Sequence, residues 1–438
     1  MELVKKVREA GVVGAGGAGF PTHVKLDSKA EWLILNAAEC EPLLKVDQQL
    51  CDEQAAELVR MMDLVAGHLG ASKAVIGIKK KHHEAVEQLQ IACGPYPKVT
   101  VFELEDFYPA GDEQVLVAEV TGRAVPELGI PLKVGCVVLN VETLLNIGRA
   151  LDGKPVTHTC LTVTGRVPEP VTFWLPIGIS YREALRLAGA ERLEGMAAID
   201  GGPMMGKILT DFDEPITKTT KGIILLEADH RLIQRKSVNV DQARRIARTA
   251  CEQCRMCTDL CPRFLLGHNM QPHKMMRKVS YSYERLEDAT IAQLCCECNL
   301  CELYACPVNL PPKTINTLYK GLLAKEGLRH TPNPTPEFRS VREYRKTPVK
   351  RLVLKLGLKE YDRPAPMRNI PYHPESVTIL LKQHIGAPAQ AVVRTGDAVT
   401  AGQLIGEIPE GAMGARVHAS IDGIVDQVEA TQITIRAK

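Results

Sequence analysis

Nine of the fourteen cysteines in this 438-residue chain lie between residues 251 and 306, in two runs of related spacing. The first run is Cys251-x2-Cys254-x2-Cys257-x3-Cys261-Pro262, and the second is Cys295-x2-Cys298-x2-Cys301-x4-Cys306-Pro307. Three thiolates spaced by two residues can surround one face of a cubane of iron and sulfide, while the fourth comes from farther along the chain. The sequence therefore predicts two [4Fe–4S] clusters that have these eight cysteines as ligands.

In two-cluster ferredoxins the fourth cysteine of each run binds the other run's cluster. We therefore expect Cys261 to serve the second centre and Cys306 to serve the first. The single extra residue before Cys306 departs from the bacterial pattern and makes the second centre the less regular of the two. Cys296 is the ninth cysteine, and we expect it to be a buried thiol beside the cluster or a substitute for Cys295.

Paired zinc sites and disulfides are the alternatives for these cysteines. Zinc requires only four ligands per ion and does not call for the Cys-Pro that ends each run. Disulfides suit secreted proteins. The first ten residues carry five charged side chains, so they lack the apolar core of a signal peptide.

Composition indicates a protein of ordinary solubility with several domains. Hydrophobic residues make up 45% of the chain and charged residues 24%, and the formal net charge is +2. This charge favours neither nucleic acid nor a membrane surface as a partner. No apolar run approaches the roughly 20 residues that a membrane helix needs, so we expect a cytoplasmic protein without a membrane span.

A glycine-rich stretch, Gly14-Ala-Gly-Gly-Ala-Gly19-Phe-Pro21, is the second feature that could do chemistry. It satisfies G-x-G-x-x-G, but a dinucleotide site needs a strand before the glycines and a helix beginning on them. Leu3, Val4 and Val7 instead predict a helix before the glycines, so this interpretation fails. Bare backbone N–H groups would still allow close approach of a phosphate or a flavin ring. An ordinary glycine-rich turn is the alternative.

The elements that would position these residues alternate along the N-terminal part. Strands over 32–36, 73–79 and 99–104 alternate with helices over 46–69 and 82–91, which predicts a parallel sheet covered on both faces. Ligands of such sheets bind at the carboxyl ends of strands. The polar turn that begins at Asn36 lies at such an end, and the turns near Gly111 and Asn140 are further polar breaks.

The later segments have other patterns. Short strands over 161–165 and 171–175 precede a helix over 181–188, a helix over 241–250 leads into the cysteines, and 277–294 is expected to be a helical spacer between the two runs. Residues 323–375 are rich in Lys, Arg and Pro, and we expect an extended linker with a short helix over 349–356 and a solvated basic face. The last segment contains two hairpin-like repeats but no lysine at 410–415, so it is not a swinging-arm carrier.

Four motifs, GAGGAGFPTHVK, NAAECEP, AGDE and LNVETL, occur in this order between residues 14 and 144. In them the chain resembles the FMN-binding domain of the flavoprotein subunit of respiratory complex I and the C subunit of the Rnf complex. The resemblance implies an FMN and NADH site formed by Gly14, Gly16, Gly17, Gly19, Phe20, Lys25, Asn36, Glu39, Glu41, Gly111, Asp112, Glu113 and Asn140. Phe20 would stack on the nicotinamide, with a core position as the alternative. Ala38, Asp112 and Leu139 depart from the complex I pattern.

The same families imply a multidomain α/β fold. We expect a complex-I-flavoprotein-like FMN and NADH domain over 1–152 and a β-grasp (SLBB) domain over 153–235. An α-helical two-cluster ferredoxin domain over 236–325 and a linker over 326–374 would follow, and a lipoyl-like barrel-sandwich hybrid domain over 375–438 would end the chain. In the Rnf C subunit a segment similar to this last one precedes the flavin domain, so the order here is permuted.

That permutation and the phrases AAECEPLLKVDQQL, CEQCRMCTDLCPR and VHASIDGIV make the whole chain resemble the cobalamin reductases of bacterial propanediol-utilisation microcompartments. The resemblance implies electron transfer from NADH through FMN and two clusters to cobalamin, beside an adenosyltransferase and shell proteins inside a microcompartment. One alternative is an Rnf-C-like module that recycles NADH in another kind of microcompartment. A scaffold in which the clusters only stabilise the fold is the other.

Overall fold

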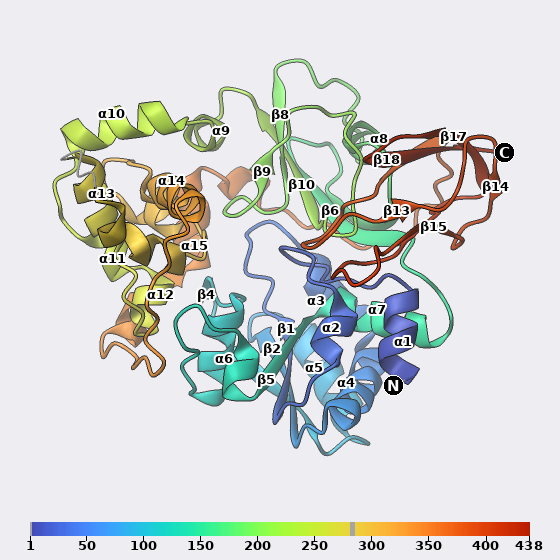
Figure 1. Cartoon of the computed structure of the whole chain (residues 1–438), viewed down its shortest axis with the longest axis horizontal. Helices are drawn as coiled ribbons and strands as arrows, with labels where there is room; N and C mark the ends of the chain where they lie inside the picture. The colour runs from blue at the N-terminus through green and yellow to red at the C-terminus, as the bar shows by residue number, and fades with distance from the viewer. Residues whose placement is uncertain (1, 281–284) are drawn as a thin grey trace.

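A parallel four-stranded sheet forms the lower half of the molecule in Figure 1. The computed structural model describes residues 2–280 and 285–438. The strand order is β3 (Val99–Leu104), β2 (Lys73–Lys79), β1 (Trp32–Ala37) and β5 (Cys136–Asn140). These strands are apolar and largely buried, as expected of a parallel sheet covered on both faces.

Helices cover the two faces of this sheet. One face packs against α1 (Glu2–Glu9), α3 (Val46–Glu53), α4 (Ala55–Leu69), α5 (His83–Cys93) and α7 (Val141–Leu151). The other face packs against α6 (Glu113–Thr121). Two short helices, α2 (Thr22–Leu26) and the 3-10 turn η1 (Pro131–Val134), complete this part. The single helix predicted over 46–69 is wrong in one respect, because Gln54 leaves helical geometry at φ −124° and divides it.

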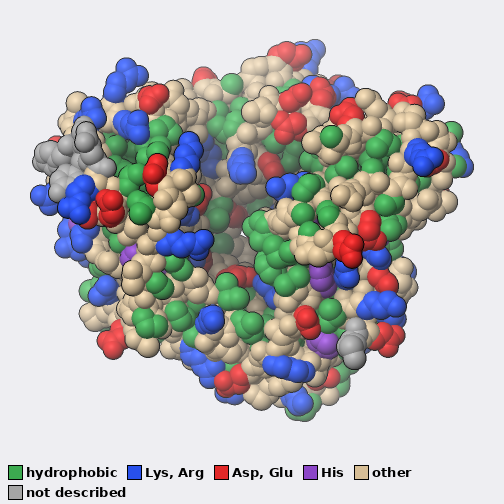
Figure 2. Space-filling model, in the orientation of Figure 1, with side chains coloured by type: hydrophobic (Ala, Val, Ile, Leu, Met, Phe, Trp, Pro, Cys, Tyr) green, Lys and Arg blue, Asp and Glu red, His purple; other side chains and the backbone are tan. Residues whose placement is uncertain are grey.

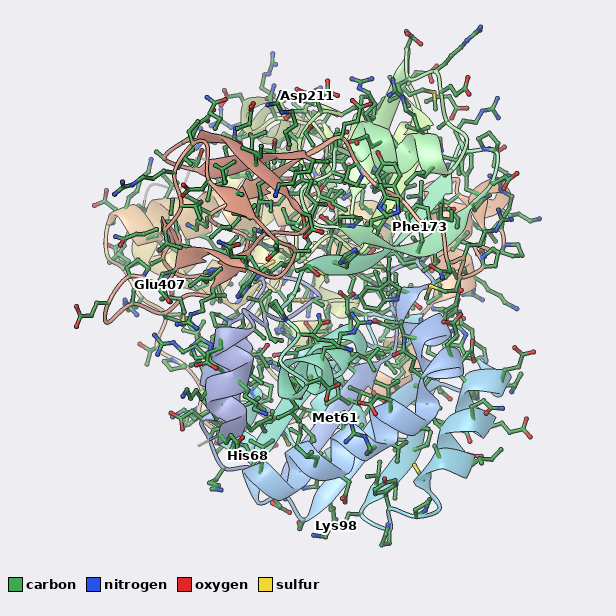
Figure 3. All side chains as sticks on the ribbon, turned by 90° about the vertical axis from the view of Figure 1, so that its right-hand side faces the viewer. Met61, His68, Lys98, Phe173, Asp211 and Glu407 are labelled. Atoms are coloured by element: carbon green, nitrogen blue, oxygen red, sulfur yellow. The ribbon has the colours of Figure 1, made fainter. Side chains whose placement is uncertain are left out.

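Two further units share one hydrophobic core. A five-stranded sheet has the order β7 (Val171–Pro176), β6 (His158–Gly165), β10 (Gly222–Glu227), β8 (Met196–Asp200) and β9 (Lys207–Ile208), with α8 (Tyr181–Leu187) against it. Phe173 of this unit, labelled in Figure 3, is fully buried in a core that also contains Ile379 and Ile433 from the C-terminal part. The two units therefore pack as one body.

The C-terminal part consists of two small sheets. One has the order β12 (Ser376–Leu380), β18 (Gln432–Ala437), β17 (Gly423–Val428) and β14 (Ala398–Val399). The other has the order β13 (Gln390–Ala391), β15 (Leu404–Glu407) and β16 (Val417–His418). This is the sandwich that the hairpin-like repeats predicted.

The cysteines lie in a helical region at the left of Figure 1. Its elements are α9 (Arg231–Lys236), α10 (Val240–Ala250), α11 (Met256–Asp259), α12 (Pro262–Leu265), α13 (Pro272–Ser280), η2 (Leu286–Leu294), η3 (Leu300–Ala305) and α14 (Pro312–Lys325). The helical spacer expected over 277–294 is wrong as one element, because α13 ends at Ser280 and a 3-10 helix begins at Leu286. Residues 281–284 lie outside the described chain.

The segment expected to be a solvated linker is folded against the rest. The short strand β11 (Thr347–Pro348) pairs with β4 (Phe107–Tyr108). Arg342, in η4 (Arg342–Arg345), and Lys346 both bind Glu119, and all three side chains are only 12–13% exposed. The helix α15 (Val349–Leu356) is where it was predicted, and η5 (Lys359–Tyr361) follows it. The prediction of a wholly solvated basic face is therefore wrong, since these cations neutralise a carboxylate of α6.

No helix in the described ranges 2–280 and 285–438 combines the length and the apolar character required to cross a bilayer.

Candidate functional site

The glycine-rich loop lies open at the start of the chain. The backbone N–H of Gly14 donates to the carbonyl of Phe20 (2.9 Å), and the N–H of Ala15 donates to Thr143 Oγ1 at 2.9 Å. Gly16, Gly17 and Ala18 are exposed, and a Cβ added to Gly17 would meet no atom within 4 Å. The loop thus presents bare backbone to an open space, which suits a phosphate group.

Other glycines of this stretch serve contacts between units. A Cβ on Gly11 would lie 2.3 Å from the carbonyl oxygen of Arg416, and one on Gly19 would lie 2.9 Å from Thr219. Both residues have positive φ, +65° and +68°. Ile385 N–H also donates to the carbonyl of Ala18 at 3.0 Å. The C-terminal sheets, which lie above α1 in Figure 3, therefore close over the two ends of the loop.

Lys218 is a buried cation beneath this loop that sequence reasoning missed. Its Nζ donates to the carbonyls of Gly11 (2.8 Å) and Arg416 (2.7 Å), and the residue is 3% exposed. Burial lowers the pKa of Lys218 to about 7. No spacing in the sequence distinguishes it from other lysines, because its partners are carbonyl groups far away in the chain.

The carboxyl ends of the strands bring together the asparagines that were predicted to line the site. Asn36 at the end of β1 lies in register with Asn140 at the end of β5. Asn36 Nδ2 donates to the carbonyl of Gly111 at 2.8 Å. Asn140 Oδ1 caps α7 by accepting from Glu142 N–H at 3.0 Å, and its Nδ2 donates to Asp47.

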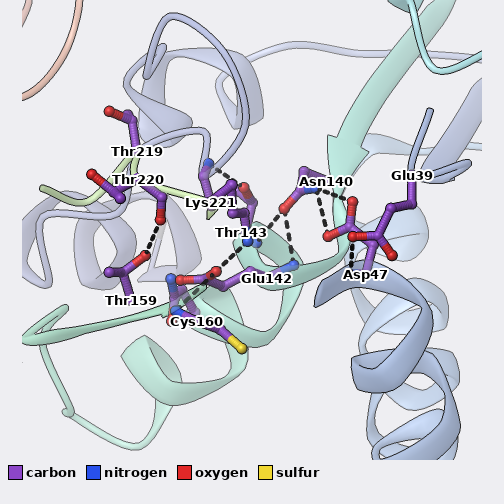
Figure 4. A network of polar contacts seen from close by, with 12 residues as sticks. Glu39, Asp47, Asn140, Glu142, Thr143, Thr159, Cys160, Thr219, Thr220 and Lys221 are labelled. Carbon is purple, nitrogen blue, oxygen red and sulfur yellow. Dashed lines mark hydrogen bonds and ion pairs between the residues drawn. The ribbon is translucent and has the colours of Figure 1, made fainter. Parts of the chain in front are cut away.

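An acidic network adjoins these asparagines, as Figure 4 shows. The carboxylate of Glu39 accepts from the backbone N–H groups of Asp47 (3.1 Å) and Gln48 (2.9 Å). Burial, followed by the negative charge of Asp47, raises the pKa of Glu39 to about 7. At the other end of the network Glu142 pairs with Lys221. Glu39 was predicted from the family resemblance, whereas Asp47, Glu142 and Lys221 were missed.

Two predicted residues of the flavin site make other contacts. Both oxygens of Glu41 accept from the backbone of the five-stranded unit, from Met204 N–H at 2.8 Å and from Met205 N–H at 2.9 Å. Lys25 Nζ donates to Glu113 at 3.0 Å and to the carbonyl of Val138 at 2.8 Å. Glu41 thus joins two units, whereas Lys25 and Glu113 stay together at the strand ends.

Phe20 follows the glycine-rich loop without joining a core. It is half-buried and belongs to none of the hydrophobic cores formed by the described residues. Its ring is therefore not held as core packing, which leaves it for a ligand.

Asp112 connects the flavin side to the cysteine region. Its Oδ1 caps α6 by accepting from Gln114 and Val115 N–H groups, both at 3.1 Å. The guanidinium of Arg263 binds both of its oxygens, at 2.6 and 2.9 Å. These side chains are only 15% and 10% exposed, and Arg263 follows Cys261 by two residues. Tyr108 adds a second link, because its hydroxyl donates to the carbonyl of Cys298 at 2.8 Å.

The two cysteine runs have matching backbones. In the first, Gln253 and Arg255 are left-handed at φ 53° and 65°, and in the second Glu297 and Asn299 are left-handed at 59° and 62°. These residues hold equivalent positions between the ligands. The extra residue of the second run is absorbed by the π-helical turn η3, in which Cys306 N–H donates to the carbonyl of Cys301 at 3.2 Å. Consequently the final cysteines share one conformation, at φ −69° for Cys261 and −71° for Cys306.

The cysteines gather in two groups that cross between the runs. Cys306 lies in a hydrophobic cluster that also contacts Cys251, and Cys261 lies in one that contacts Cys295. Burial, followed by the nearby Cys306, Cys251 and Cys254, raises the pKa of Cys257 to about 12. A cavity is lined by Cys261, Cys295, Cys296, Cys298 and Cys301 together with Asn299 and Asn316.

The surroundings of these thiols suit iron–sulfur clusters. N–H groups point at the sulfurs, from Gln253 Nε2 to Cys251 (3.1 Å), from Leu310 N to Cys306 (3.2 Å) and from Glu297 N to Cys295 (3.4 Å). All fourteen cysteines are free, so the disulfide alternative is not formed. Among the described residues no three His, Cys, Asp or Glu side chains are arranged around a position for a single metal ion.

Comparison with known proteins places this geometry in a family. Residues 7–149 match the model of the Nuo51 FMN-binding domain, 250–311 that of a 4Fe–4S dicluster domain, and 355–438 that of the RnfC barrel sandwich hybrid domain. The cobalamin reductase PduS of Salmonella typhimurium is 46% identical over 99% of this chain and 96% of its own length. The chain belongs to the PduS cobalamin reductase family. PduS of Citrobacter freundii is 45% identical over 98% of this chain and 95% of its own.

More distant relatives agree with the domain content of the PduS family. The RnfC-type component of the Na⁺-translocating ferredoxin:NAD⁺ oxidoreductase complex of Acetobacterium woodii is 36% identical over 59% of this chain and 57% of its own. Among solved structures, the NAD⁺-reducing [NiFe]-hydrogenase in its H2-reduced state covers 79% of this chain and 63% of its own at 20% identity, with a TM-score of 0.47. The family models confirm the FMN-binding domain, the dicluster domain and the C-terminal barrel-sandwich domain.

We predict that Asp112→Asn destabilises the protein. Asparagine keeps the cap of α6 but leaves Arg263 as an uncompensated buried charge, so the free energy of unfolding should fall by about 3–5 kcal/mol. Urea denaturation followed by circular dichroism measures this change. Asp213→Asn is the matched control, since Asp213 pairs with Arg182 at the surface and should cost about 1 kcal/mol or less. Equal losses in the two variants would contradict the structural role of Asp112.

We predict that Glu39→Gln changes how stability depends on pH. In the folded protein the pKa of Glu39 is about 7, above its ordinary value of 4.5, so between these values the folded state binds the additional proton. The contribution of this carboxyl to stability therefore falls as pH rises from 4.5 to 7. Glu39→Gln should flatten that decline in urea denaturation at about pH 5 and about pH 7.5. Glu53→Gln, on the exposed side of α3, is the control, and an unchanged slope in Glu39→Gln would refute the assignment.

Proposed function

We propose that this chain passes electrons from NADH through FMN and two [4Fe–4S] clusters to cobalamin, from cob(III)alamin through cob(II)alamin to cob(I)alamin. The observation that carries the proposal is the 46% identity with a cobalamin reductase over 99% of the chain. The buried Asp112–Arg263 pair supports it, because it fixes the flavin side against the cysteines.

The residues proposed for FMN lie at the carboxyl ends of β1 and β5 and on the glycine loop. The exposed N–H groups of Gly16 and Gly17 suit the phosphate, and Lys25 supplies a positive charge at the strand ends. Gly14, Gly19, Asn36, Glu39, Glu41, Gly111, Asp112, Glu113 and Asn140 would surround or support the rest. Phe20 remains the residue proposed to meet the nicotinamide. Bound FMN supplies the conversion of a hydride into single electrons, which iron–sulfur clusters carry.

The proposed ligand sets are crossed. Cys251, Cys254, Cys257 and Cys306 would hold one cluster, and Cys261, Cys295, Cys298 and Cys301 the other. The second set is the inner one, because Arg263 and Tyr108 tie it to the flavin side. The first set is the outer one, since Cys254 is its exposed member. Electrons would therefore travel from the flavin side to the inner set and then to the outer set.

The wider setting is also a proposal. We keep the division into domains at 1–152, 153–235, 236–325, 326–374 and 375–438. A location in the cytoplasm within a microcompartment, with an adenosyltransferase and shell proteins as neighbours, rests on the sequence resemblance and on the relatives' name.

We predict that Cys306→Ser disturbs the cluster of Cys251, Cys254 and Cys257. Replacement of a thiolate by a hydroxyl weakens binding to iron, so one of two electron paramagnetic resonance signals should broaden or disappear in the reduced protein. Cys261→Ser should affect the other signal. Loss of the same signal in Cys306→Ser and in Cys295→Ser would show that the sets are not crossed.

The decisive test combines the reconstituted protein with NADH and hydroxocobalamin under anaerobic conditions. We predict cobalamin reduction, seen in its visible spectrum, that disappears when FMN is omitted. Rapid reduction of ferricyanide with inert cobalamin would instead support the Rnf-C-like alternative, in which another acceptor is served. If NADH is not oxidised at all, the clusters have a structural role.

A further inference from the structure

Positive charge is concentrated around the outer group of cysteines. Residues 240–280 contain eight Lys or Arg and three Asp or Glu, a formal charge of +5, whereas the whole chain has +2. Figure 2 shows Lys and Arg side chains over the end of the molecule where α10 and α13 lie. The rest of the chain is therefore net acidic, and this charge marks one end of the molecule.

Helix packing turns these charges toward solvent. Ala243 and Ala247 of α10 pack against Met275, Met276 and Val279 of α13, so the apolar faces of the two helices meet each other. The exposed members on the other faces define a basic collar, which consists of Arg245, Arg248, Arg255, Lys274 and Arg277. The inward-facing cation of this stretch, Arg263, is buried and paired with Asp112, so it does not belong to the collar.

The collar surrounds the outer cysteines. Arg255 lies between Cys254 and Cys257 in the sequence, and α10 ends one residue before Cys251. α13 packs against α11, and His273 at its start hydrogen-bonds to the hydroxyl of Thr258 at 2.7 Å, directly after Cys257. Exposed Ile246 and Met256 add apolar surface among these cations. Cys254 is the exposed member of the eight proposed ligands, so an acceptor comes nearest to a cluster inside this collar.

We propose that the basic collar is the docking surface for an acidic protein that takes single electrons from the outer cluster. The inference rests on the proposed electron path and adds a partner to it. Charge complementarity of this kind steers association and orients the partner, while the apolar side chains supply contact at the centre. NADH supplies two electrons and yields NAD⁺ and a proton. Each encounter oxidises the outer cluster by one electron and reduces the acceptor protein by one.

Charge reversal on α13 tests the proposal in the full, cofactor-loaded protein. The variant Lys274→Glu with Arg277→Glu changes two exposed side chains one turn apart. With NADH as donor and an oxidised, acidic flavodoxin as probe, stopped-flow absorbance should show electron transfer slowed about tenfold or more. In the unaltered protein the same rate should fall as KCl is raised from about 20 to about 300 mM.

A second variant and a second acceptor complete the experiment. Lys98→Glu with Lys133→Glu reverses two exposed charges on the flavin domain and should leave the flavodoxin rate unchanged. Iron content and the rate of flavin reduction by NADH should match in all three proteins, which shows that the variants are folded and loaded. If the α13 variant reduces flavodoxin as fast as the unaltered protein, the docking surface is refuted.

Free hydroxocobalamin separates this inference from the proposed function. Its reduction should be insensitive to reversal of the collar, because a small cationic corrinoid is not steered by a basic surface. Absence of cobalamin reduction, combined with salt-dependent transfer to flavodoxin, would overturn the proposed acceptor and leave the docking surface standing.

Discussion

The buried ion pair between Asp112 and Arg263 is the contact on which the arrangement of the redox elements depends. It satisfies a helix cap on one side and a guanidinium two residues from a cysteine on the other. Removal of a charge from water is costly, and such a pair is stable only when its geometry and remaining hydrogen bonds are complete. The position of the cysteine region against the flavin sheet is therefore sharply defined, since a small displacement would leave two buried charges unpaired. Tyr108 and Glu119 reinforce the same interface with a hydrogen bond and two cations.

Glycine has two different physical roles within one short stretch. Gly16 and Gly17 leave backbone exposed, whereas Gly11 and Gly19 allow other units to approach so closely that a methyl group would collide. The same clamp buries Lys218 with carbonyl oxygens as partners. The flavin loop is thus shaped by three units of the chain, and its open part is the portion that those units leave uncovered.

The sequence predicted well whatever depends on local spacing. The cysteine runs, the helix before the glycines, and the asparagines at neighbouring strand ends are set by short-range pattern and by the geometry of parallel sheets. Glu41 and Asp112 were assigned to the flavin by resemblance, but their oxygens bind Met204, Met205 and Arg263, which lie far away in sequence. Arg342 and Lys346 looked like solvated charges because a sequence does not show that Glu119 awaits them. Long-range partners of polar groups were therefore the part that pattern could not supply.

Closure of the glycine loop by the C-terminal sheets has a consequence for biosynthesis. The loop is made within the first twenty residues, yet Gly19 lies against His384, and Gly11 against Arg416. While the ribosome is still translating the middle of the chain, the loop lacks the neighbours that give it its shape. The complete flavin cradle exists only after almost the whole polypeptide has emerged, so cofactor loading belongs to the finished chain and not to the nascent one.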